Sequence, residues 1–111
     1  MTKVNIWKSE DTYCSKIVSS GHAGYSQEGS DIICAAISTA MELVIDMLDE
    51  FSVDFDLKFD EKSALIEIQF KQSDNNRIKY DTIRHILDGY KRYISDLSDE
   101  YPEYVTISTE V

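Results

Sequence analysis

The chain has 111 residues, 42% of them hydrophobic and 29% charged, and carries a net charge of −10 from 21 acidic and 11 basic residues. This length allows one compact core, so we expect a single domain over residues 1–111, and the acidic balance disfavours binding to the phosphate backbone of a nucleic acid. Because no run approaches the roughly 20 apolar residues of a membrane span and the N-terminus lacks the apolar block of a signal peptide, we expect a cytoplasmic protein.

The hydrophobic pattern along the chain predicts two β-hairpins, each followed by an amphipathic helix, and a final strand. In the strand segments apolar and polar residues alternate, whereas in the helical segments apolar residues recur every three or four positions. Ser73 and Asp74 cap the second helix, and Pro102 marks the break after it. The expected elements are strands around residues 4–7 and at 13–20, 53–59, 64–71 and 104–108, and helices at 31–49 and 74–97.

These elements define an α+β fold with the order ββαββαβ. Two amphipathic helices need apolar cover, and the economical arrangement packs both on one face of a mostly antiparallel five-stranded sheet. In the third strand we expect Phe55, Leu57 and Phe59 to supply a buried face. The acidic residues of that hairpin lack the glycine and closely spaced ligands of a calcium loop, so we expect neither a metal site nor a cofactor.

The most informative stretch is residues 21–38, where a cysteine falls on the first turn of the first helix. Asp31 is a good N-cap, because its carboxylate can accept hydrogen bonds from the exposed amides of that turn. Cys34 is then the third helical residue, where these amides and the helix dipole favour an anion. The thiolate is the nucleophilic form of cysteine. Ser38 stands one turn further along the same face.

A histidine lies in the loop that precedes this helix. Gly21, Gly24 and Gly29 give the loop access to positive φ and allow a ligand to approach closely, and His22 follows the end of the second strand. An imidazole brought alongside Cys34 would complete a Cys/His pair, which is the minimum needed for acyl transfer. The spacing alone leaves a second interpretation open, because a free cysteine on an apolar helix is also a common core residue.

The same residues resemble the signature of a known family. The pattern consists of Gly21-His22-Ala23, an interval ending in Gly29, and then Asp31-Ile32-x-Cys34-Ala35-Ala36-x-Ser38. It is similar to that of the ribosomal-processing cysteine proteases of bacteria, the Prp family, and the resemblance extends over the whole chain in size and element order. By this resemblance Cys34 is the nucleophile and His22 its general base, while Gly21, Gly29, Asp31 and Ser38 bind substrate or support the site.

The resemblance also implies a function and partners. A member of this family is a cysteine endopeptidase that removes the short N-terminal extension of the large-subunit ribosomal protein numbered twenty-seven during ribosome maturation. The implied partners are that ribosomal protein precursor and a second copy of the chain in a homodimer. Because the cut in this family follows a hydrophobic, aromatic-ending segment, we expect an apolar groove near Cys34. The negative net charge agrees in sign with a basic ribosomal substrate.

Two other functions remain compatible with the residues. An acidic module could bind a basic ribosomal protein without cleaving it, and a thiol redox protein could use Cys14 together with Cys34. The pair Cys14 and Cys34 lacks the close CxxC spacing typical of thiol redox proteins, and Cys14 falls within an expected strand. His85, on the second helix, is a weaker candidate than His22 for the general base, because nothing in the sequence places it near Cys34.

Overall fold

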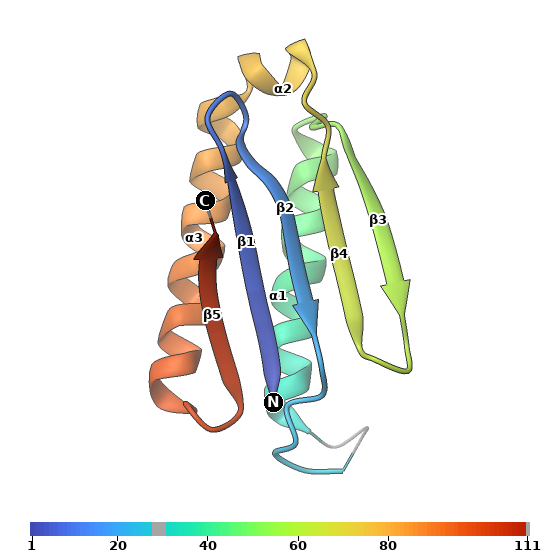
Figure 1. Ribbon diagram of the computed structural model, residues 1–111, viewed down its shortest axis with the longest axis vertical. Helices are drawn as coiled ribbons and strands as arrows, with labels where there is room; N and C mark the ends of the chain where they lie inside the picture. Colours follow the sequence, from blue (N-terminus) through green and yellow to red (C-terminus); the bar gives the residue numbers. More distant parts are fainter. Residues whose placement is uncertain (28–30, 111) are drawn as a thin grey trace.

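The chain folds as one sheet with helices behind it (Figure 1). The computed structural model describes residues 1–27 and 31–110. The strands are β1 (Thr2–Ser9), β2 (Tyr13–Ser20), β3 (Phe55–Asp60), β4 (Leu65–Phe70) and β5 (Val105–Glu110), and the helices are α1 (Ile32–Glu50), α2 (Asp74–Ile78) and α3 (Tyr80–Glu100). The predicted α+β order, with two hairpins, their helices and a last strand, is confirmed.

The five strands lie in the order β3-β4-β2-β1-β5. Each hairpin pairs its own two strands antiparallel, and an antiparallel β2–β4 pair joins the two hairpins. β5 instead runs parallel to β1, with Val105 opposite Thr2. The prediction of a mostly antiparallel five-stranded sheet is therefore confirmed, and the parallel pairing places the last strand beside the first, with Glu110 opposite Trp7.

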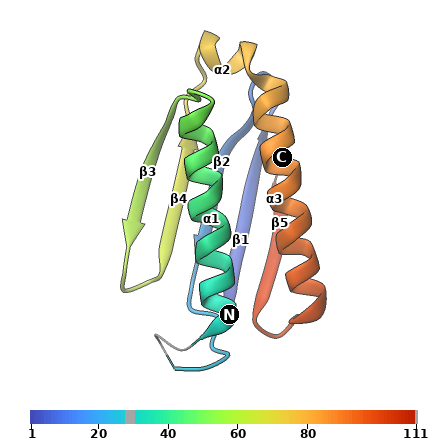
Figure 2. The same ribbon diagram turned by 180° about the vertical axis from the view of Figure 1, so that it is seen from behind.

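Helices α1 and α3 lie side by side across one face of the sheet (Figure 2). In both helices the buried positions repeat every three or four residues, as the sequence pattern predicts. No helix within the described residues combines the length and apolar character needed to cross a membrane. The core between helices and sheet includes Val4, Ile6, Ile17, Ile68 and Val105 from the strands and Ile33, Met41, Leu48, Ile83, Leu87 and Ile94 from the helices.

The expected buried face of β3 is only partly covered. Phe55 is half-buried, but Leu57 is 39% exposed and Phe59 is 62% exposed. β3 is an edge strand, and α1 lies over the neighbouring strands of the sheet rather than over β3 (Figure 2). The alternating pattern thus identifies the residues that share a face, but the prediction that all of them are buried is wrong.

The expected second helix is divided into α2 and α3. Lys79 ends the first and begins the second, with φ −92° and ψ 18°. The side chain of Asn76, which is buried, hydrogen-bonds the main chain of Asp54 and Lys71. These bonds tie α2 to the ends of the second hairpin and so fix its direction independently of α3. Ser73 caps α2 as predicted, because its hydroxyl accepts a hydrogen bond from the Asn76 amide.

Candidate active site

Cys34 lies on the first turn of α1. Asp31 is the N-cap, and its Oδ1 atom accepts hydrogen bonds from the backbone amides of Ile33 and Cys34, both at 3.0 Å. The capped helix start expected from the sequence is therefore present. The cap fixes the backbone of Cys34. Its side chain is only half-buried, so it stays within reach of a ligand.

The other oxygen of Asp31 holds the loop that precedes the helix. Oδ2 accepts hydrogen bonds from the amides of Tyr25 at 3.0 Å and Ser26 at 3.3 Å. Burial on its own would raise the pKa of the Asp31 carboxyl, but the four amides of Cys34, Ser26, Tyr25 and Ile33 donate to the carboxylate and hold its pKa below its usual value. One carboxylate thus ties the loop to the turn that carries the cysteine.

Replacing Asp31 with asparagine is expected to lower stability at neutral pH and much less in acid. Asparagine keeps one acceptor oxygen, so one of the two pairs of amides loses its partner, at a cost of about 1 kcal/mol. A carboxyl group whose pKa is lowered by folding adds stability above its unfolded pKa of about 3.9, and this contribution is lost as the pH falls through the folded pKa.

Urea unfolding of both proteins, near neutral pH and in steps below about pH 4, measures this difference. We expect the gap between wild type and Asp31→Asn to narrow as the solution is acidified. A gap of constant size over the whole range would mean that the charge of Asp31 does not stabilise the fold.

The loop contacts the cysteine through its main chain. The Ala23 amide donates a hydrogen bond to Cys34 Sγ at 3.2 Å. Ala23 itself is buried, whereas the preceding His22 side chain is exposed. The structure therefore brings the histidine segment against the sulfur, and the contact is made by a backbone amide one residue beyond the imidazole that we expect to act on the thiol.

Gly21 fixes the point at which this loop leaves β2. Its φ is +89°, and a Cβ atom there would lie 2.5 Å from the carbonyl oxygen of Met1, so no side chain fits. The Gly21 amide donates to the carbonyl of Ser63 at 2.9 Å, and its carbonyl accepts from the Thr2 hydroxyl at 2.8 Å. His22 thus follows a residue that is anchored both to the start of β1 and to the β3–β4 turn.

An aromatic cluster holds the loop on the far side of His22. The ring of Tyr25 packs edge-on against the rings of Tyr104 and Tyr101, with centroid distances of 5.3 and 6.1 Å. Both partners belong to the connection between α3 and β5. Such pairs contribute about 0.5–1.5 kcal/mol each, so the segment around His22 is held by Gly21 before it and by Tyr25 after it.

A small cleft of about 40 Å³ opens beside the cysteine. Of the residues that the sequence predicts for the site, the structure places Gly21, Cys34 and Ser38 in the lining of this cleft, and Asp31 supports it from the helix start. Gly29 lies outside the described residues. The full lining is Thr2, Ser19, Gly21, Cys34, Ile37, Ser38, Ala64 and Ile66.

Cys14 is buried in β2 at the other end of the strand from Gly21. Burial raises the pKa of its thiol to about 12, which keeps the sulfur protonated and unreactive. Cys34 contacts Ala23, just beyond the far end of β2. At about 3.3 Å per residue, the stretch of β2 from Cys14 to Ser20 spans roughly 20 Å, far more than a disulfide bridges. Both cysteines are free. A redox function that pairs Cys14 with Cys34 therefore has no support in this fold.

Sequence reasoning missed two contributors to the site. The first is the Ala23 amide, because a backbone donor leaves no signal in the type of side chain. The second is the ring of Tyr25, whose partners Tyr101 and Tyr104 come more than seventy positions later in the chain. No periodic pattern links residues so far apart, so only the folded chain reveals the cluster.

At this end of the molecule the Cys34 sulfur can act as a nucleophile. The His22 imidazole comes directly before the Ala23 amide that contacts this sulfur. That chemistry defines the class of cysteine proteases. Within this class the chain belongs to the family described as cysteine protease Prp, whose model matches residues 1–106. The family resemblance inferred from the motif around His22 and Cys34 is confirmed, and the chain is a cysteine-type peptidase.

Solved structures share the fold. The chain is 20% identical to a crystal structure described as an essential ribosomal processing protease Prp from S. aureus in complex with a covalently linked product peptide, with a TM-score of 0.83 and coverage of 99% of this chain and 100% of the other. A second S. aureus structure, in complex with a substrate peptide, gives 21% identity, a TM-score of 0.79 and the same coverage. A crystal structure of SMU.848 from Streptococcus mutans gives 22% identity, a TM-score of 0.83 and coverage of 99% and 94%. No curated protein matches the chain significantly.

Proposed function

We propose that the chain is an endopeptidase that removes the N-terminal extension of the large-subunit ribosomal protein numbered twenty-seven, with Cys34 as nucleophile and His22 as general base. Family membership supports the class of reaction. The S. aureus relatives, described as ribosomal processing proteases with bound peptides, support the substrate class. The observation that carries the choice of residues is the hydrogen bond from the Ala23 amide to Cys34 Sγ, since it joins the histidine loop to the thiol.

In this mechanism His22 takes the thiol proton as the Cys34 sulfur attacks the scissile carbonyl carbon. The carbonyl double bond opens to a tetrahedral oxyanion, and its collapse breaks the peptide bond. The leaving amine receives the proton from the His22 imidazolium, which leaves an acyl-enzyme on Cys34. Water then attacks the thioester with His22 again as base, and the product acid and the free thiol are restored.

The oxyanion needs a hydrogen-bond donor near the sulfur. The amides of Ile33 and Cys34 already donate to the Asp31 carboxylate, and the Ala35 amide donates to the Asp31 carbonyl. These three amides of the first turn are therefore already engaged. Since the Ala23 amide lies 3.2 Å from the sulfur, it is the donor that we assign to the oxyanion, and attack on a carbonyl would transfer this hydrogen bond from sulfur to oxygen.

The charge of the chain suits the proposed substrate. A net charge of −10 attracts basic polypeptides, repels nucleic-acid backbones and raises the encounter rate with a ribosomal protein precursor before it joins the ribosome. We place this reaction in the cytoplasm, where ribosomal precursors are made.

A cleavage assay tests the function. The protein is incubated with the precursor of the ribosomal protein and with a matched protein that lacks the extension, and the products are identified by mass spectrometry. We expect one new N-terminus from the precursor and no product from the shortened protein. Binding of the precursor without any cut would support the competing function, an acidic module that holds a basic ribosomal protein.

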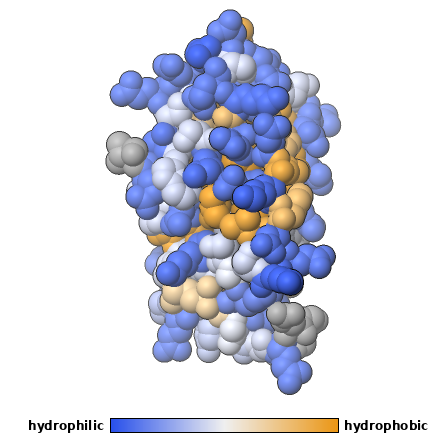
Figure 3. Space-filling view, turned by 45° about the vertical axis from the view of Figure 1, so that its right-hand side comes forward, coloured by the Kyte–Doolittle hydropathy of each residue, from blue (hydrophilic) through white to orange (hydrophobic). Residues whose placement is uncertain are grey.

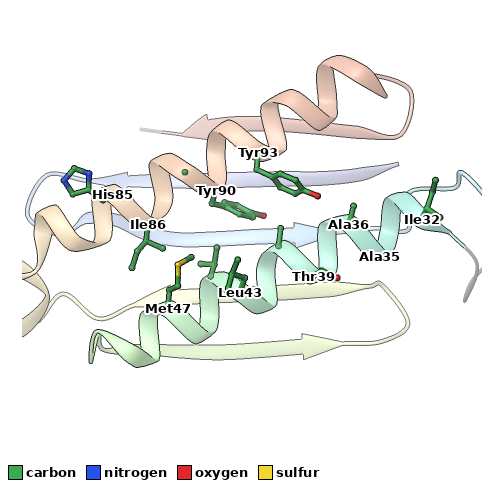
Figure 4. Close-up of a pocket in the computed structure, with 13 residues that line it drawn as sticks. Ile32, Ala35, Ala36, Thr39, Leu43, Met47, His85, Ile86, Tyr90 and Tyr93 are labelled. Carbon is green, nitrogen blue, oxygen red and sulfur yellow. The ribbon is translucent and has the colours of Figure 1, made fainter.

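We also propose that the chain forms a homodimer through an apolar groove between α1 and α3 (Figure 4). The groove has a volume of about 790 Å³, and Ile32, Ala36 and Leu43 of α1 face Tyr90 and Tyr93 of α3 across it. Leu43 is 58% exposed and Tyr93 44% exposed, so the groove leaves much apolar surface uncovered. Surface of this kind is typical of an interface between proteins.

Charge favours a second copy as the occupant. Glu42 and Asp46 flank Leu43 on α1, a helix without any basic residue, whereas α3 places Arg92 beside Tyr93. A two-fold axis that packs α1 of one copy on α3 of the other would bring these opposite charges together.

Introducing a charge into the groove is expected to dissociate the dimer. Leu43→Asp would bury a carboxylate beside Glu42 and Asp46, so its association should weaken by about tenfold or more. The matched control is Phe51→Asp, because Phe51 is 51% exposed and lies outside the groove lining. Sedimentation velocity over a range of concentrations measures both. A wild-type chain that sediments as a monomer throughout would contradict the homodimer.

A further inference from the structure

The apolar surface beside the cysteine extends from the cleft onto the edge of the sheet. Ile66 of β4 lines the cleft together with Cys34. Phe59 of β3 lies directly opposite Ile66, and Leu57 lies opposite Ile68. Residues directly opposite in an antiparallel pair project from the same side of the sheet, and Ile68 is fully buried beneath the helices. Leu57 and Phe59 therefore project toward the helix side, one strand, or about 5 Å, from the wall of the cleft.

These edge residues are exposed although their neighbours are buried. Phe59 is 62% exposed and Leu57 39% exposed. Figure 3 turns the β3 side of the molecule forward and shows hydrophobic surface among hydrophilic residues on that side. A single exposed apolar side chain needs no explanation, but several that continue the lining of a cleft next to a nucleophile indicate a binding surface.

The surface changes from apolar to acidic with distance from the cysteine. A second cleft, of about 400 Å³, begins at Leu57, and its lining includes the acidic residues Asp49, Asp54 and Asp56 together with Lys71. An extended chain that lies along β3 from Phe59 toward the start of the strand would pass from apolar contacts to this acidic cleft. The charge there favours a lysine or arginine on the ligand.

We propose that Leu57, Phe59 and Ile66, named here the edge surface, bind an apolar segment of the polypeptide substrate, and that the acidic cleft binds a basic residue of the same segment. The inference rests on the proposed endopeptidase function and names the residues that select its substrate. Continuity with the Cys34 cleft places the occupant next to the reacting sulfur. Charge complementarity at the far end argues for a basic polypeptide rather than for a second copy of this acidic chain.

Peptide binding to the Cys34→Ala protein tests the proposal, because a protein without the nucleophile binds but does not cut. The probe is a fluorescein-labelled synthetic peptide of twelve or so residues with two phenylalanines followed by two lysines, read by fluorescence anisotropy. In the Cys34→Ala background, Phe59→Ser should weaken binding by about tenfold, since it removes most of one aromatic contact. Phe51→Ser is the matched control, because Phe51 is 51% exposed and lies at the end of α1 outside the edge surface, and it should leave binding unchanged.

Two further arms examine the two halves of the surface. A peptide with serines in place of the phenylalanines should bind equally to the Phe59→Ser and unmodified proteins, because it makes no apolar contact to lose. Asp56→Asn should reduce the salt dependence of binding by the phenylalanine-containing peptide, since one carboxylate of the acidic cleft is neutralised. Both variants change exposed side chains of an edge strand, so circular dichroism should show unchanged folding.

The binding and sedimentation measurements can each overturn the proposal. Equal binding by Phe59→Ser and Phe51→Ser would mean that the edge surface does not contact the peptide, and no binding by the unmodified Cys34→Ala protein would exclude a peptide of this chemistry. A change in sedimentation of Phe59→Ser alone would assign the surface to a second copy. Failure of the wild-type protein to cleave any precursor would overturn the proposed function instead, because the anisotropy measurement requires no cleavage.

Discussion

Replacing Cys34 with alanine is expected to reduce cleavage of the ribosomal precursor by roughly 10⁴-fold or more, because alanine offers no atom that can attack the carbonyl carbon. The fold should survive the change. Cys34 is half-buried, and the amides at its turn are held by Asp31 rather than by the thiol. Initial rates of product formation, measured by mass spectrometry at equal protein concentration, give the ratio directly.

Cys14 supplies the control for this experiment. Its thiol is buried, and burial raises its pKa to about 12, so Cys14→Ala should keep cleavage within about twofold of wild type and lose only some stability through the small cavity. Alkylation by iodoacetamide should likewise modify Cys34 and spare Cys14 in the folded protein. Full activity in Cys34→Ala, or loss of activity in folded Cys14→Ala, would show that the wrong sulfur has been assigned.

The helix start at the site could be predicted because its causes are local. Asp31 and Cys34 are three residues apart, and the cap geometry depends only on that spacing and on the apolar pattern that follows. The observed bonds from Ile33 and Cys34 to Asp31 match this expectation. In the same way the alternation in β3 and β4 correctly predicts which side chains share a face.

The rest of the site depends on contacts between distant segments. The ring of Tyr25 rests on the α3–β5 connection, and the Thr2 hydroxyl donates to the Gly21 carbonyl. Neither pair leaves a periodic signal, because each depends on how β1, β2 and β5 come together. The exposure of Phe59 has the same origin, since it reflects the edge position of β3 in the strand order. A local pattern contains no information on that order.

Replacing His22 with alanine is expected to lower kcat by about 10²- to 10⁴-fold, the usual contribution of a positioned acid and base. The loss should fall mainly on kcat, because His22 acts on the thiol proton and on the leaving amine, whereas the cleft beside Cys34 remains intact. The loop itself should keep its place, since it is held by Gly21, Ala23 and Tyr25 through contacts that do not involve the imidazole.

Chemical rescue separates a base from a purely structural histidine. His22 is exposed, so the alanine variant leaves a space that solvent can enter, and added imidazole should restore part of the lost rate in proportion to its concentration. Without imidazole, hydroxide must remove the thiol proton, and the activity of His22→Ala should keep rising with pH where that of wild type has levelled off. A variant whose pH profile matches that of wild type, and which imidazole does not rescue, would mean that the Ala23 contact positions the loop for a different residue to act as the base.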